Sequence, residues 1–534
     1  MLKIVLNLAI ASLLLSCRSS QNETGSALES TAPNQVFKNY SGSIVCSPQK
    51  IVKPSTIQEV QAAVLEAQKE KANVRVISLP VPKSYSPVIC PEVGGTFINV
   101  ESFNKILSID ANSLTAIVQP GILINQLQDQ LNEKGFTFPV TPDYNGVSLG
   151  GGMGTGAHHS SLKFATGISD WVEEIKLVDG KGELKTLSGK DMDTARVHLG
   201  LLGVIVELKI RILPQYKLKY SLDKGSDAKL DTEILKLVRQ HEYARVMWFP
   251  SQKTYVLDHF DKVSMDTPGD SYNNLWTSTP NVSWLGDTVI GTLNANQTTQ
   301  CAAEAIRAKT FFGPFKAVNS DGKAPVGLSH KMIASTCEVG KCSWDHGIKT
   351  RTVEIGIEAE RLPDWIREVR TMIAAKKACF PILGVYIRFS AASTGALSEA
   401  YGHDSAVFEI HIPQISKPTL EPSSDVYDEM VQMTLAKYNG RPHWGKNSQP
   451  YFMNLGPEQY PNWKEFQKLR ASLDPEGRFV NPFWSQIESK TSSVARTPGC
   501  AVAKTCICQI DSDCGPGATC EAGSYFKEAK VCRR

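Results

Sequence analysis

A run of glycines between Gly150 and Gly156 constrains the fold of this chain more than any other segment. Five of these seven residues are glycine. Because glycine lacks a Cβ atom, several peptide N–H groups in such a run can approach an anion such as a pyrophosphate. A Rossmann dinucleotide site would require a helix that begins inside the glycines, whereas here the run continues into His158 and further polar residues. The run therefore favours nucleotide binding on a fold other than the Rossmann fold, with a plain flexible loop as the alternative.

The residues around this run, from about 45 to 215, alternate short β-branched segments with amphipathic helices. Apolar residues at helical spacing predict helices from residue 57 and over 122–134, and Gly135 is expected to stop the second helix. Residues 74–79 have the pattern of a buried strand. Helices and strands mixed in this way predict an α+β fold rather than a doubly wound sheet.

Composition limits the class of protein. The chain has 534 residues, enough for two to four domains, and its 57 basic and 54 acidic side chains are too balanced to predict nucleic-acid binding. The one long apolar run, residues 4–16, would span about 20 Å as a helix, which is short of the ~30 Å core of a bilayer. This excludes a polytopic membrane protein and predicts an export signal.

The end of the apolar run, Leu14-Leu15-Ser16-Cys17, resembles a bacterial lipobox, in which the cysteine is acylated and becomes the mature N-terminus. We therefore expect residues 1–17 to be a lipoprotein signal peptide and Cys17 to carry the lipid, with an ordinary signal peptide as the alternative. Residues 18–38 are polar and are expected to form a flexible tether. These features predict a protein exported and anchored to a bacterial membrane, on its periplasmic or cell-surface face.

The remaining twelve cysteines are expected to form disulfides, because export places them in an oxidising compartment. We predict a Cys46–Cys90 bridge and two further pairs among four cysteines of the C-terminal half. Six more cysteines in the last 35 residues are too dense for an ordinary core and predict a three-bridge module of open connectivity, with zinc as the alternative. The four cysteines of the C-terminal half are Cys301, Cys337, Cys342 and Cys379. The six of the tail are Cys500, Cys506, Cys508, Cys514, Cys520 and Cys532.

The segments that follow the glycine run carry a family resemblance. Residues 167–178, a turn at 179–182 and residues 198–206 follow in an order that resembles the FAD-binding domain of the vanillyl-alcohol oxidase superfamily, and within it the aldonolactone oxidases. A Gly-Gly loop that closes on Gly-x-His and a later Gly-x-x-Gly-Val/Ile strand are the family patterns. They are matched by Gly150, Gly151, Gly156 and His158, and by Gly200, Gly203 and Val204.

The C-terminal half extends the resemblance. His443-Trp444-Gly445-Lys446 matches the His-Trp-x-Lys signature of aldonolactone oxidases, and residues 473–479 match their Leu-Asp-Pro-x-Gly-x-Phe element. The cysteine-rich tail is similar to that of plant-type L-gulono-1,4-lactone oxidases. The resemblance covers residue 40 to the C-terminus. It implies an FAD-binding domain of two α+β subdomains at 39–216, a substrate domain with an antiparallel sheet and flanking helices at 217–490, and a cysteine-rich module at 491–534.

The resemblance also implies roles for individual residues. Arg388 and Lys446 would bind substrate oxygens and the N1–C2 region of the flavin, and Tyr386 lies on the same strand face as Arg388. His443 is a weaker candidate for proton acceptance. The alternative for Arg388 is an ordinary ion-paired arginine on a strand. The alternative for His443 and Trp444 is a pair that serves packing rather than catalysis. The residues expected to hold FAD are Lys83, Ser84, Gly150, Gly151, Gly154, Gly156, His158, Ser160, Gly200, Gly203 and Val204.

Two departures from the family change what is expected. Many relatives tether FAD covalently through a histidine in a glycine-containing loop, but here Pro82 or Lys83 stands at that position. We therefore expect FAD to be held non-covalently, with Lys83 able to contact a phosphate. In addition, Tyr386 occupies the glutamate position of the Glu-x-Arg strand found in several relatives. A tyrosine supplies no carboxylate at neutral pH, so the orientation of the substrate is expected to differ.

The expected function is FAD-dependent oxidation of an aldono-1,4-lactone of the L-gulono, L-galactono or D-arabinono type. The family mechanism implies hydride transfer to flavin N5, followed by reoxidation by oxygen or another acceptor. One alternative is an alditol or oligosaccharide oxidase on the same fold, whose substrate is a polyol or sugar. The other is a flavin-free, lipid-anchored carbohydrate-binding protein.

Overall fold

The computed structural model describes residues 36–39, 42, 44–78, 84, 86–273, 292, 296–310, 324–334, 350–380, 384–413, 420–453, 459–489 and 496–534. The predicted signal peptide with Cys17 lies outside the described residues, as do Lys83, Cys337 and Cys342. No helix among the described residues is long and apolar enough to cross a membrane.

The N-terminal half begins with a small parallel sheet. After the short pair β1 (Phe37–Lys38) and β2 (Val45–Cys46), strands β3 (Lys50–Val52), β5 (Thr96–Asn99) and β4 (Val74–Ile77) pair in that order. Helix α1 (Ile57–Glu70) connects β3 to β4 and buries Val60, Val64 and Ala67. It begins at Thr56, whose hydroxyl accepts a hydrogen bond from the Glu59 N–H at 3.2 Å, so the polar residues before it act as a helix cap.

A second α+β unit follows, built on a five-stranded antiparallel sheet. Its strand order is β10 (Leu184–Ser188), β9 (Val172–Val178), β11 (Val204–Arg211), β7 (Thr115–Val118) and β6 (Ile106–Asp110). Helices α2 (Ile124–Asn132), α3 (Leu149–Gly154) and α4 (Gly189–Ala195) pack against it. Strands β8 (Phe136–Thr137) and β12 (Leu213–Pro214) form a separate short pair.

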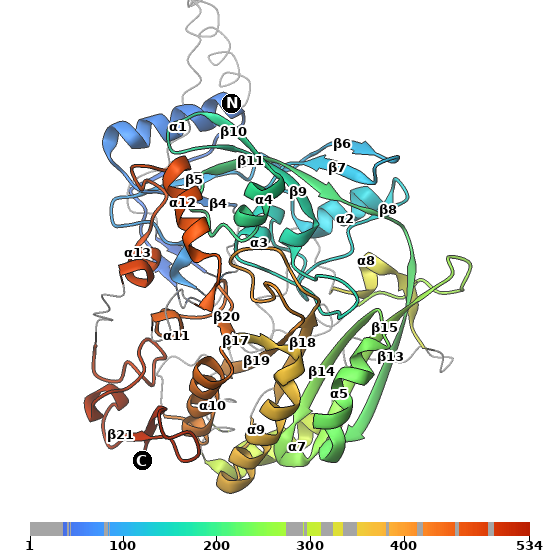
Figure 1. Ribbon diagram of the computed structural model, residues 1–534, viewed down its shortest axis with the longest axis vertical. Helices are drawn as coiled ribbons and strands as arrows, with labels where there is room; N and C mark the ends of the chain where they lie inside the picture. The colour runs from blue at the N-terminus through green and yellow to red at the C-terminus, as the bar shows by residue number, and fades with distance from the viewer. Residues whose placement is uncertain are drawn as a thin grey trace, which may run out of the picture.

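The C-terminal half is built on an eight-stranded sheet in which every described pairing is antiparallel. This sheet lies below the N-terminal half in Figure 1. The strand order is β16 (Val326–Leu328), β13 (Lys217–Ser226), β15 (Thr254–Val263), β14 (Tyr243–Phe249), β18 (Val385–Ser390), β19 (Ser405–Pro413), β17 (Thr350–Glu358) and β20 (Arg441–Pro442).

The two faces of this sheet differ in polarity because side chains alternate along each strand. Apolar residues such as Trp248, Ile387 and Phe408 pack under helices α5 (Leu230–Arg239), α9 (Leu362–Lys376) and α10 (Ser424–Lys437). The intervening residues, including Arg245 and Arg388, form a charged row on the opposite face. Helices α7 (Gln297–Thr310) and α8 (Ser329–Met332) complete this half.

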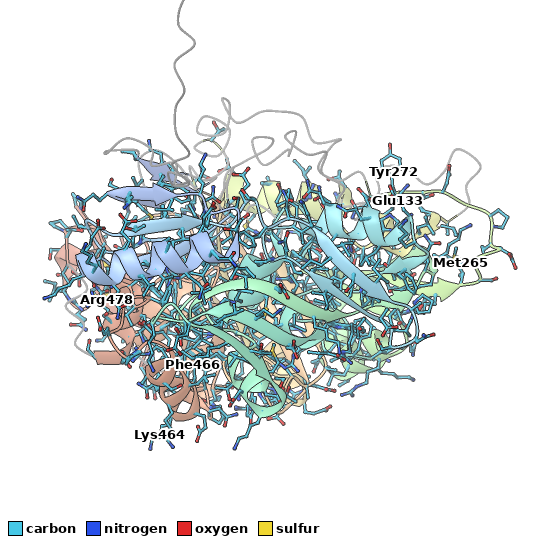
Figure 2. The ribbon with its side chains drawn as sticks, turned by 90° about the horizontal axis from the view of Figure 1, so that it is seen from above. Glu133, Met265, Tyr272, Lys464, Phe466 and Arg478 are labelled. Atoms are coloured by element: carbon cyan, nitrogen blue, oxygen red, sulfur yellow. A yellow bond between two sulfur atoms is a disulfide. The ribbon has the colours of Figure 1, made fainter. Side chains whose placement is uncertain are left out.

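The chain then returns to the N-terminal half. After α11 (Pro450–Met453), helices α12 (Trp463–Leu473) and α13 (Pro482–Ser489) bury Trp463, Phe466 and Trp484 in the same core as the five-stranded sheet. Figure 2 shows Lys464 projecting outward from α12 while Phe466 points inward. The expected substrate domain, residues 217–490, therefore contributes to two cores, because its last two helices belong to the core of the N-terminal half.

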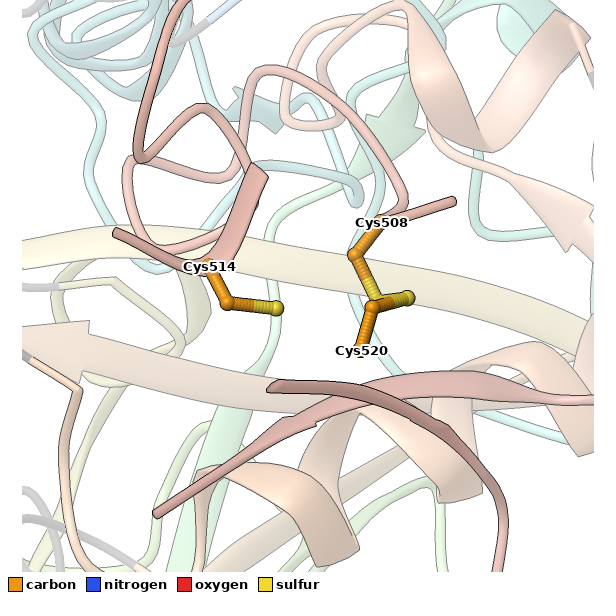
Figure 3. Close-up of side chains that lie close together, drawn as sticks. All are labelled: Cys508, Cys514 and Cys520. Carbon is orange, nitrogen blue, oxygen red and sulfur yellow. A yellow bond between two sulfur atoms is a disulfide. The ribbon is translucent and has the colours of Figure 1, made fainter. Parts of the chain in front are cut away.

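Disulfides join segments in both halves and staple the tail. Cys46 bonds to Cys90 as predicted, and Cys301 bonds to Cys379. The tail contains three bridges around strands β21 (Thr519–Ala522) and β22 (Lys530–Arg533), and Figure 3 shows the Cys508–Cys520 bridge beside Cys514. The other two tail bridges are Cys500–Cys506 and Cys514–Cys532. The tail is thus a disulfide module packed against α10.

Candidate active site

The glycine run is helical, which corrects the expectation of a loop. Helix α3 runs through Gly150, Gly151 and Gly154, although each helical glycine costs about 1 kcal/mol relative to alanine. Close packing explains the glycines, because a Cβ atom on Gly150 would lie 2.8 Å from Pro120 and one on Gly154 would lie 2.8 Å from the His198 ring. The run therefore lets neighbouring segments approach the helix backbone.

After the helix, the chain passes into the eight-stranded sheet. Gly156 has a φ of 77°, a conformation that side-chain-bearing residues rarely adopt. The next residues enter between β14 and β18, where Ser161 N–H donates to the Phe389 carbonyl at 2.9 Å and Ser160 Oγ accepts from Phe389 N–H at 3.0 Å. Ser160 Oγ also donates to the Ala244 carbonyl. This insertion brings His158 against the charged face of the sheet.

The second predicted cofactor segment lies beside the first. Leu199 N–H donates to the Gly154 carbonyl at 2.8 Å, and Gly203, with a φ of 138°, precedes Val204 at the start of β11. Gly200 N–H donates to His198 Nδ1 at 2.9 Å, so the ring carries its hydrogen on Nε2. That buried donor has no hydrogen-bond partner among the described residues.

Ser84 links the predicted cofactor loop to the predicted catalytic turn. Its hydroxyl donates to the Gly445 carbonyl at 3.1 Å, inside the His-Trp-x-Lys segment. Three segments far apart in the chain, at Ser84, at Gly150–His158 and at 443–446, therefore lie close together.

The centre of the charged face is a buried cluster of two cations and two carboxylates. Arg388 donates to Glu354, and to Glu409 at 3.0 Å. Lys446 donates to Glu354 and lies 3.0 Å from Glu409. Glu354 is fully buried, and the Lys446 side chain keeps 20% of its surface exposed. The sequence-predicted Arg388 and Lys446 are thus brought together by two carboxylates that sequence reasoning missed.

Sheet register explains how the carboxylates reach this place. Glu409 of β19 lies directly opposite Tyr386 of β18, and Glu354 of β17 lies directly opposite Glu409. Tyr386 therefore does not leave the site without a carboxylate, since the two neighbouring strands supply one each. Arg388 and Tyr386 share a face of β18 as predicted, and the Tyr386 hydroxyl donates to Asp143 at 3.0 Å.

The two carboxylates differ in proton affinity. Burial opposes ionisation of Glu354, but Arg388 and Lys446 hold its pKa well below the usual range. Burial raises the pKa of Glu409 to about 7, against the opposing effect of Lys446 and Arg388. Near neutral pH Glu354 is therefore a fixed counter-ion, whereas Glu409 can gain or lose a proton.

His158 and Glu399 close one side of the cluster. His158 Nδ1 lies 2.8 Å from the His159 carbonyl and Nε2 lies 2.9 Å from Glu354 Oε1. Glu399 approaches the same nitrogen at 3.8 Å. Burial and the nearby Glu354 charge raise the pKa of Glu399 well above its usual value, so this group is a neutral acid. His158 and Glu399 line a cavity between the two halves, together with Thr155 and Gly156.

The turn that carries Lys446 is fixed by its neighbours. The Trp444 ring packs among the rings of Phe452, Tyr460, Trp463 and Trp484 with centroids 4.5 to 6.5 Å away. His443 N–H donates to the Glu354 carbonyl at 3.0 Å. The signature thus anchors an aromatic ring in the N-terminal core and places the lysine at Glu354.

His443 does not fit the role of proton acceptor. Its Nδ1 accepts from Gly445 N–H at 3.0 Å, so its Nε2 carries the hydrogen and donates to the Gly156 carbonyl at 3.1 Å. Burial lowers its pKa to about 3. With both nitrogens engaged, the ring holds the turn against the glycine segment. Glu409 is the better candidate, and its only sequence signal was a lone carboxylate on a β-branched strand.

Sequence comparison identifies the family. The family described as D-arabinono-1,4-lactone oxidase matches residues 208–487, more than half of the chain. The chain belongs to this family of aldonolactone oxidases. A family described as FAD binding domain matches residues 48–188, and one described as L-gulonolactone oxidase 2-like, C-terminal domain matches residues 497–534.

Curated relatives match most of this chain. L-gulonolactone oxidase 2 of Arabidopsis thaliana is 28% identical, over 92% of this chain and 89% of that protein. L-gulonolactone oxidase 5 of the same plant is 29% identical over 91% and 89%. L-gulonolactone oxidase of Mus musculus is 24% identical over 84% and 98%.

Solved structures share the fold of this chain. A structure titled solvent-stable cholesterol oxidase has a TM-score of 0.69 at 16% identity, covering 88% of this chain and 100% of that chain. Cholesterol oxidase from B. sterolicum has a TM-score of 0.69 at 15% identity, covering 86% and 97%. The predicted fold class, with an FAD-binding domain, a substrate domain and a cysteine-rich module, is confirmed.

The cofactor of this protein is FAD, and the protein is an oxidoreductase acting on CH–OH groups. Its residues fit an acceptor-rich cofactor, since the His198 Nε2 donor is buried beside Gly154 without a partner among the described side chains. The segments around Ser84, Gly150–His158 and Gly200–Val204 are the ones that would hold FAD. The FAD-binding match favours the enzyme over the flavin-free binding protein.

Proposed function

We propose that this enzyme oxidises a ring carbinol of an aldono-1,4-lactone of the L-gulono, L-galactono or D-arabinono type. The observation that carries the proposal is the buried cluster of Arg388, Lys446, Glu354 and Glu409. Two cations held in place by carboxylates can bind hydroxyl and carbonyl oxygens without rearranging when charge develops. The names of the curated relatives support a lactone as the substrate.

Three residues of the cluster act on the substrate in this proposal. Lys446, the most exposed of the four, donates to a substrate oxygen, and Arg388 stabilises negative charge that develops during the reaction. Ionised Glu409 accepts the proton of the substrate hydroxyl. FAD, when bound, would supply the redox chemistry as the acceptor of the hydride from the carbinol carbon, with oxygen or another acceptor as the final oxidant. The carbinol thereby becomes a carbonyl.

A substrate panel tests the proposal. The purified protein is assayed with the three aldono-1,4-lactones, with alditols and with an oligosaccharide, using peroxide detection in air and a dye acceptor without oxygen. We expect kcat/KM for at least one lactone to exceed that for every alditol and oligosaccharide. Higher kcat/KM for an alditol or oligosaccharide would replace the lactone with the alternative substrate class. Dye reduction without peroxide formation would identify a dehydrogenase.

Glu409 predicts the pH dependence of the reaction. Because burial raises its pKa to about 7, the carboxylate is protonated below that pH and cannot accept a proton. We expect kcat/KM to rise with pH through about 7, since this parameter reports the free enzyme. Glu409→Gln should remove this limb and lower the rate above pH 7 by about 100-fold. A Gln variant with the wild-type profile would exclude Glu409 as the acceptor.

FAD is expected to leave the denatured protein. The position at which relatives carry the linking histidine is occupied here by Pro82 or Lys83, neither of which forms the known histidyl bond. After precipitation with trichloroacetic acid, the yellow colour should appear in the supernatant and the pellet should be colourless. A yellow pellet that stays coloured after washing would show a covalent link. Absorption near ~370 and ~450 nm before precipitation confirms that the sample carries flavin.

We further propose that the enzyme is exported and lipid-anchored through Cys17. The support is the sequence of residues 1–17, together with the disulfides of the folded chain, which persist in oxidising compartments. Expressed in a bacterium, the wild type should fractionate with membranes and Cys17→Ser should remain unacylated. Labelling with a radioactive fatty acid measures this directly. Equal labelling of the two proteins would exclude Cys17 as the lipid site.

A further inference from the structure

Two histidines and two aspartates lie together outside the active site. His259 and Asp261 are on β15, Asp223 is on the neighbouring strand β13, and His241 follows the end of α5. Leu257, which alternation places on the same face as His259, packs under the helices. The cluster therefore lies on the helix-covered face of the eight-stranded sheet, opposite the face of Arg245 and Arg388.

The side chains converge on one carboxylate. His241 Nδ1 lies 3.0 Å from Asp261 Oδ2, and His259 Nδ1 lies 3.2 Å from the same oxygen. The two imidazole rings are stacked with centroids 3.6 Å apart. On the far side of its ring, His259 Nε2 lies 3.1 Å from Asp223 Oδ2. Asp261 keeps 42% of its side chain exposed and Asp223 keeps 68%, so solvent reaches the cluster.

The number of N–H groups on the two imidazole rings limits which hydrogen bonds this cluster can make. A neutral imidazole has one N–H, yet His259 faces a carboxylate at each nitrogen. If Nε2 donates to Asp223, the Nδ1 lone pair points at Asp261, which is unfavourable unless a positive charge lies between them. A cation bound between both rings and Asp261 satisfies every group.

The spacing suits a transition-metal ion. Ligands at about 2.0–2.1 Å from a tetrahedral ion lie about 3.3 Å from one another, close to the 3.0 and 3.2 Å found here. A histidine that ligates through one nitrogen commonly donates its other N–H to a carboxylate, which fixes the ring. Asp223 stands in that position. Imidazole and carboxylate ligands together favour Zn²⁺ and similar divalent ions.

We propose that His241, His259 and Asp261 bind a divalent transition-metal ion of the Zn²⁺ type, with Asp223 as the carboxylate that orients His259. The ion joins the end of α5 to β15. The same turn contacts the active-site segment from the other side, because the Glu242 carbonyl accepts from Ser161 Oγ at 2.7 Å and the Ala244 carbonyl accepts from Ser160 Oγ. The site is thus a structural clamp behind the insertion that carries His158.

A second group of possible ligands lies in the active site and must be separated in the experiment. His158, His443, Glu354 and Glu399 also have ligand atoms within 4.8 Å of one another. There, however, Lys446 and Arg388 neutralise Glu354, and both His443 nitrogens are engaged with backbone groups. Those cations oppose a further positive charge, which is why we assign the ion to the His241 cluster.

The test measures Zn²⁺ binding to the full-length FAD enzyme, purified with a histidine-free tag and treated with a chelator. Isothermal titration calorimetry with Zn²⁺ should show one site per chain, and Co²⁺ at the same site should give the absorption of a tetrahedral complex. His259→Asn should abolish this binding. Asp223→Asn should weaken it by about 10–100-fold, the effect usual for such orienting carboxylates.

Two variants serve as controls, one for folding and one for the loss of a histidine elsewhere. Asp223 is mostly exposed, so Asp223→Asn should fold normally even if His259→Asn does not. His403→Asn, at a histidine whose Nδ1 lies 3.0 Å from the Asp404 carbonyl and which belongs to neither cluster, should bind Zn²⁺ like the wild type. Unchanged Zn²⁺ affinity in Asp223→Asn, or binding lost in His158→Gln but kept in His259→Asn, would overturn the proposal. Absence of any Zn²⁺ binding by the folded wild type would do the same.

Discussion

Replacing Arg388 with methionine is expected to lower kcat/KM by about 100- to 1,000-fold, the usual cost of removing one preorganised donor from an active site. The guanidinium is buried and is held in a fixed orientation by Glu354 and Glu409. Little free energy is therefore needed to reorient it as charge develops on the substrate. Methionine has a similar length but carries no charge. Steady-state kinetics with the preferred lactone, on protein whose flavin content matches the wild type, measures the effect.

Arg388→Lys is the matched control, because it keeps the positive charge but lacks the planar guanidinium group. Arg388 donates to both carboxylates through Nη2 and to the His158 carbonyl through Nη1 at 3.3 Å. Lysine has a single nitrogen and cannot make all of these contacts in the same geometry, so we expect only partial recovery of kcat/KM. Lys446→Met should also reduce kcat/KM, and the double variant should lose less than the sum of the two single effects because the cations share the same partners. An Arg388→Met enzyme with wild-type kcat/KM would show that the arginine only pairs charges.

Glu354→Gln should destabilise the fold by about 3–5 kcal/mol, the cost of breaking a buried ion pair by removing one partner. Glu354 is fully buried and is the shared counter-ion of Arg388 and Lys446. Without its charge, two buried cations depend on Glu409 alone. Urea unfolding followed by far-UV circular dichroism, at equal flavin occupancy, gives the change in the free energy of unfolding.

Glu399→Gln is the control for this variant because it removes a carboxyl of similar burial in the same site. Burial keeps Glu399 neutral, so glutamine replaces it with little electrostatic change, and we expect a loss of about 1 kcal/mol or less. If the two variants lost the same stability, the charge of Glu354 would not be what holds the cluster together.

Much of the fold could be predicted because its signals are local. The helix after Thr56 has a cap and an apolar face, and α2 ends before Gly135, so pattern and structure agree there. The helix through Gly150–Gly154 could not be predicted, because propensity argues against it. Its stability comes from contacts with Pro120 and His198, which lie far away in the sequence. Tertiary packing overrode local preference at that place.

The residues of the candidate site also divide into those that a local motif marks and those that only tertiary structure brings in. Arg388, Lys446 and Tyr386 were found because a short motif marks them. Glu354, Glu409 and Glu399 were missed because each is a single carboxylate whose partners are fixed by sheet register rather than by sequence neighbours. For His443 the sequence left proton acceptance and packing as alternatives, because a motif shows that a residue matters without showing which atoms it contacts. Its ring nitrogens serve backbone groups on both sides.

The return of the last helices to the N-terminal core has a consequence for biosynthesis. Val74 N–H donates to the Arg478 carbonyl at 2.7 Å, and Arg75 donates to the Phe479 carbonyl at 3.0 Å, across some 400 residues of chain. The nascent N-terminal half therefore lacks part of its own interior until α13 has been made. We expect such late, non-local closure to make folding slow and largely post-translational. The FAD-binding half is contiguous in the sequence, but it cannot be excised as an autonomous unit.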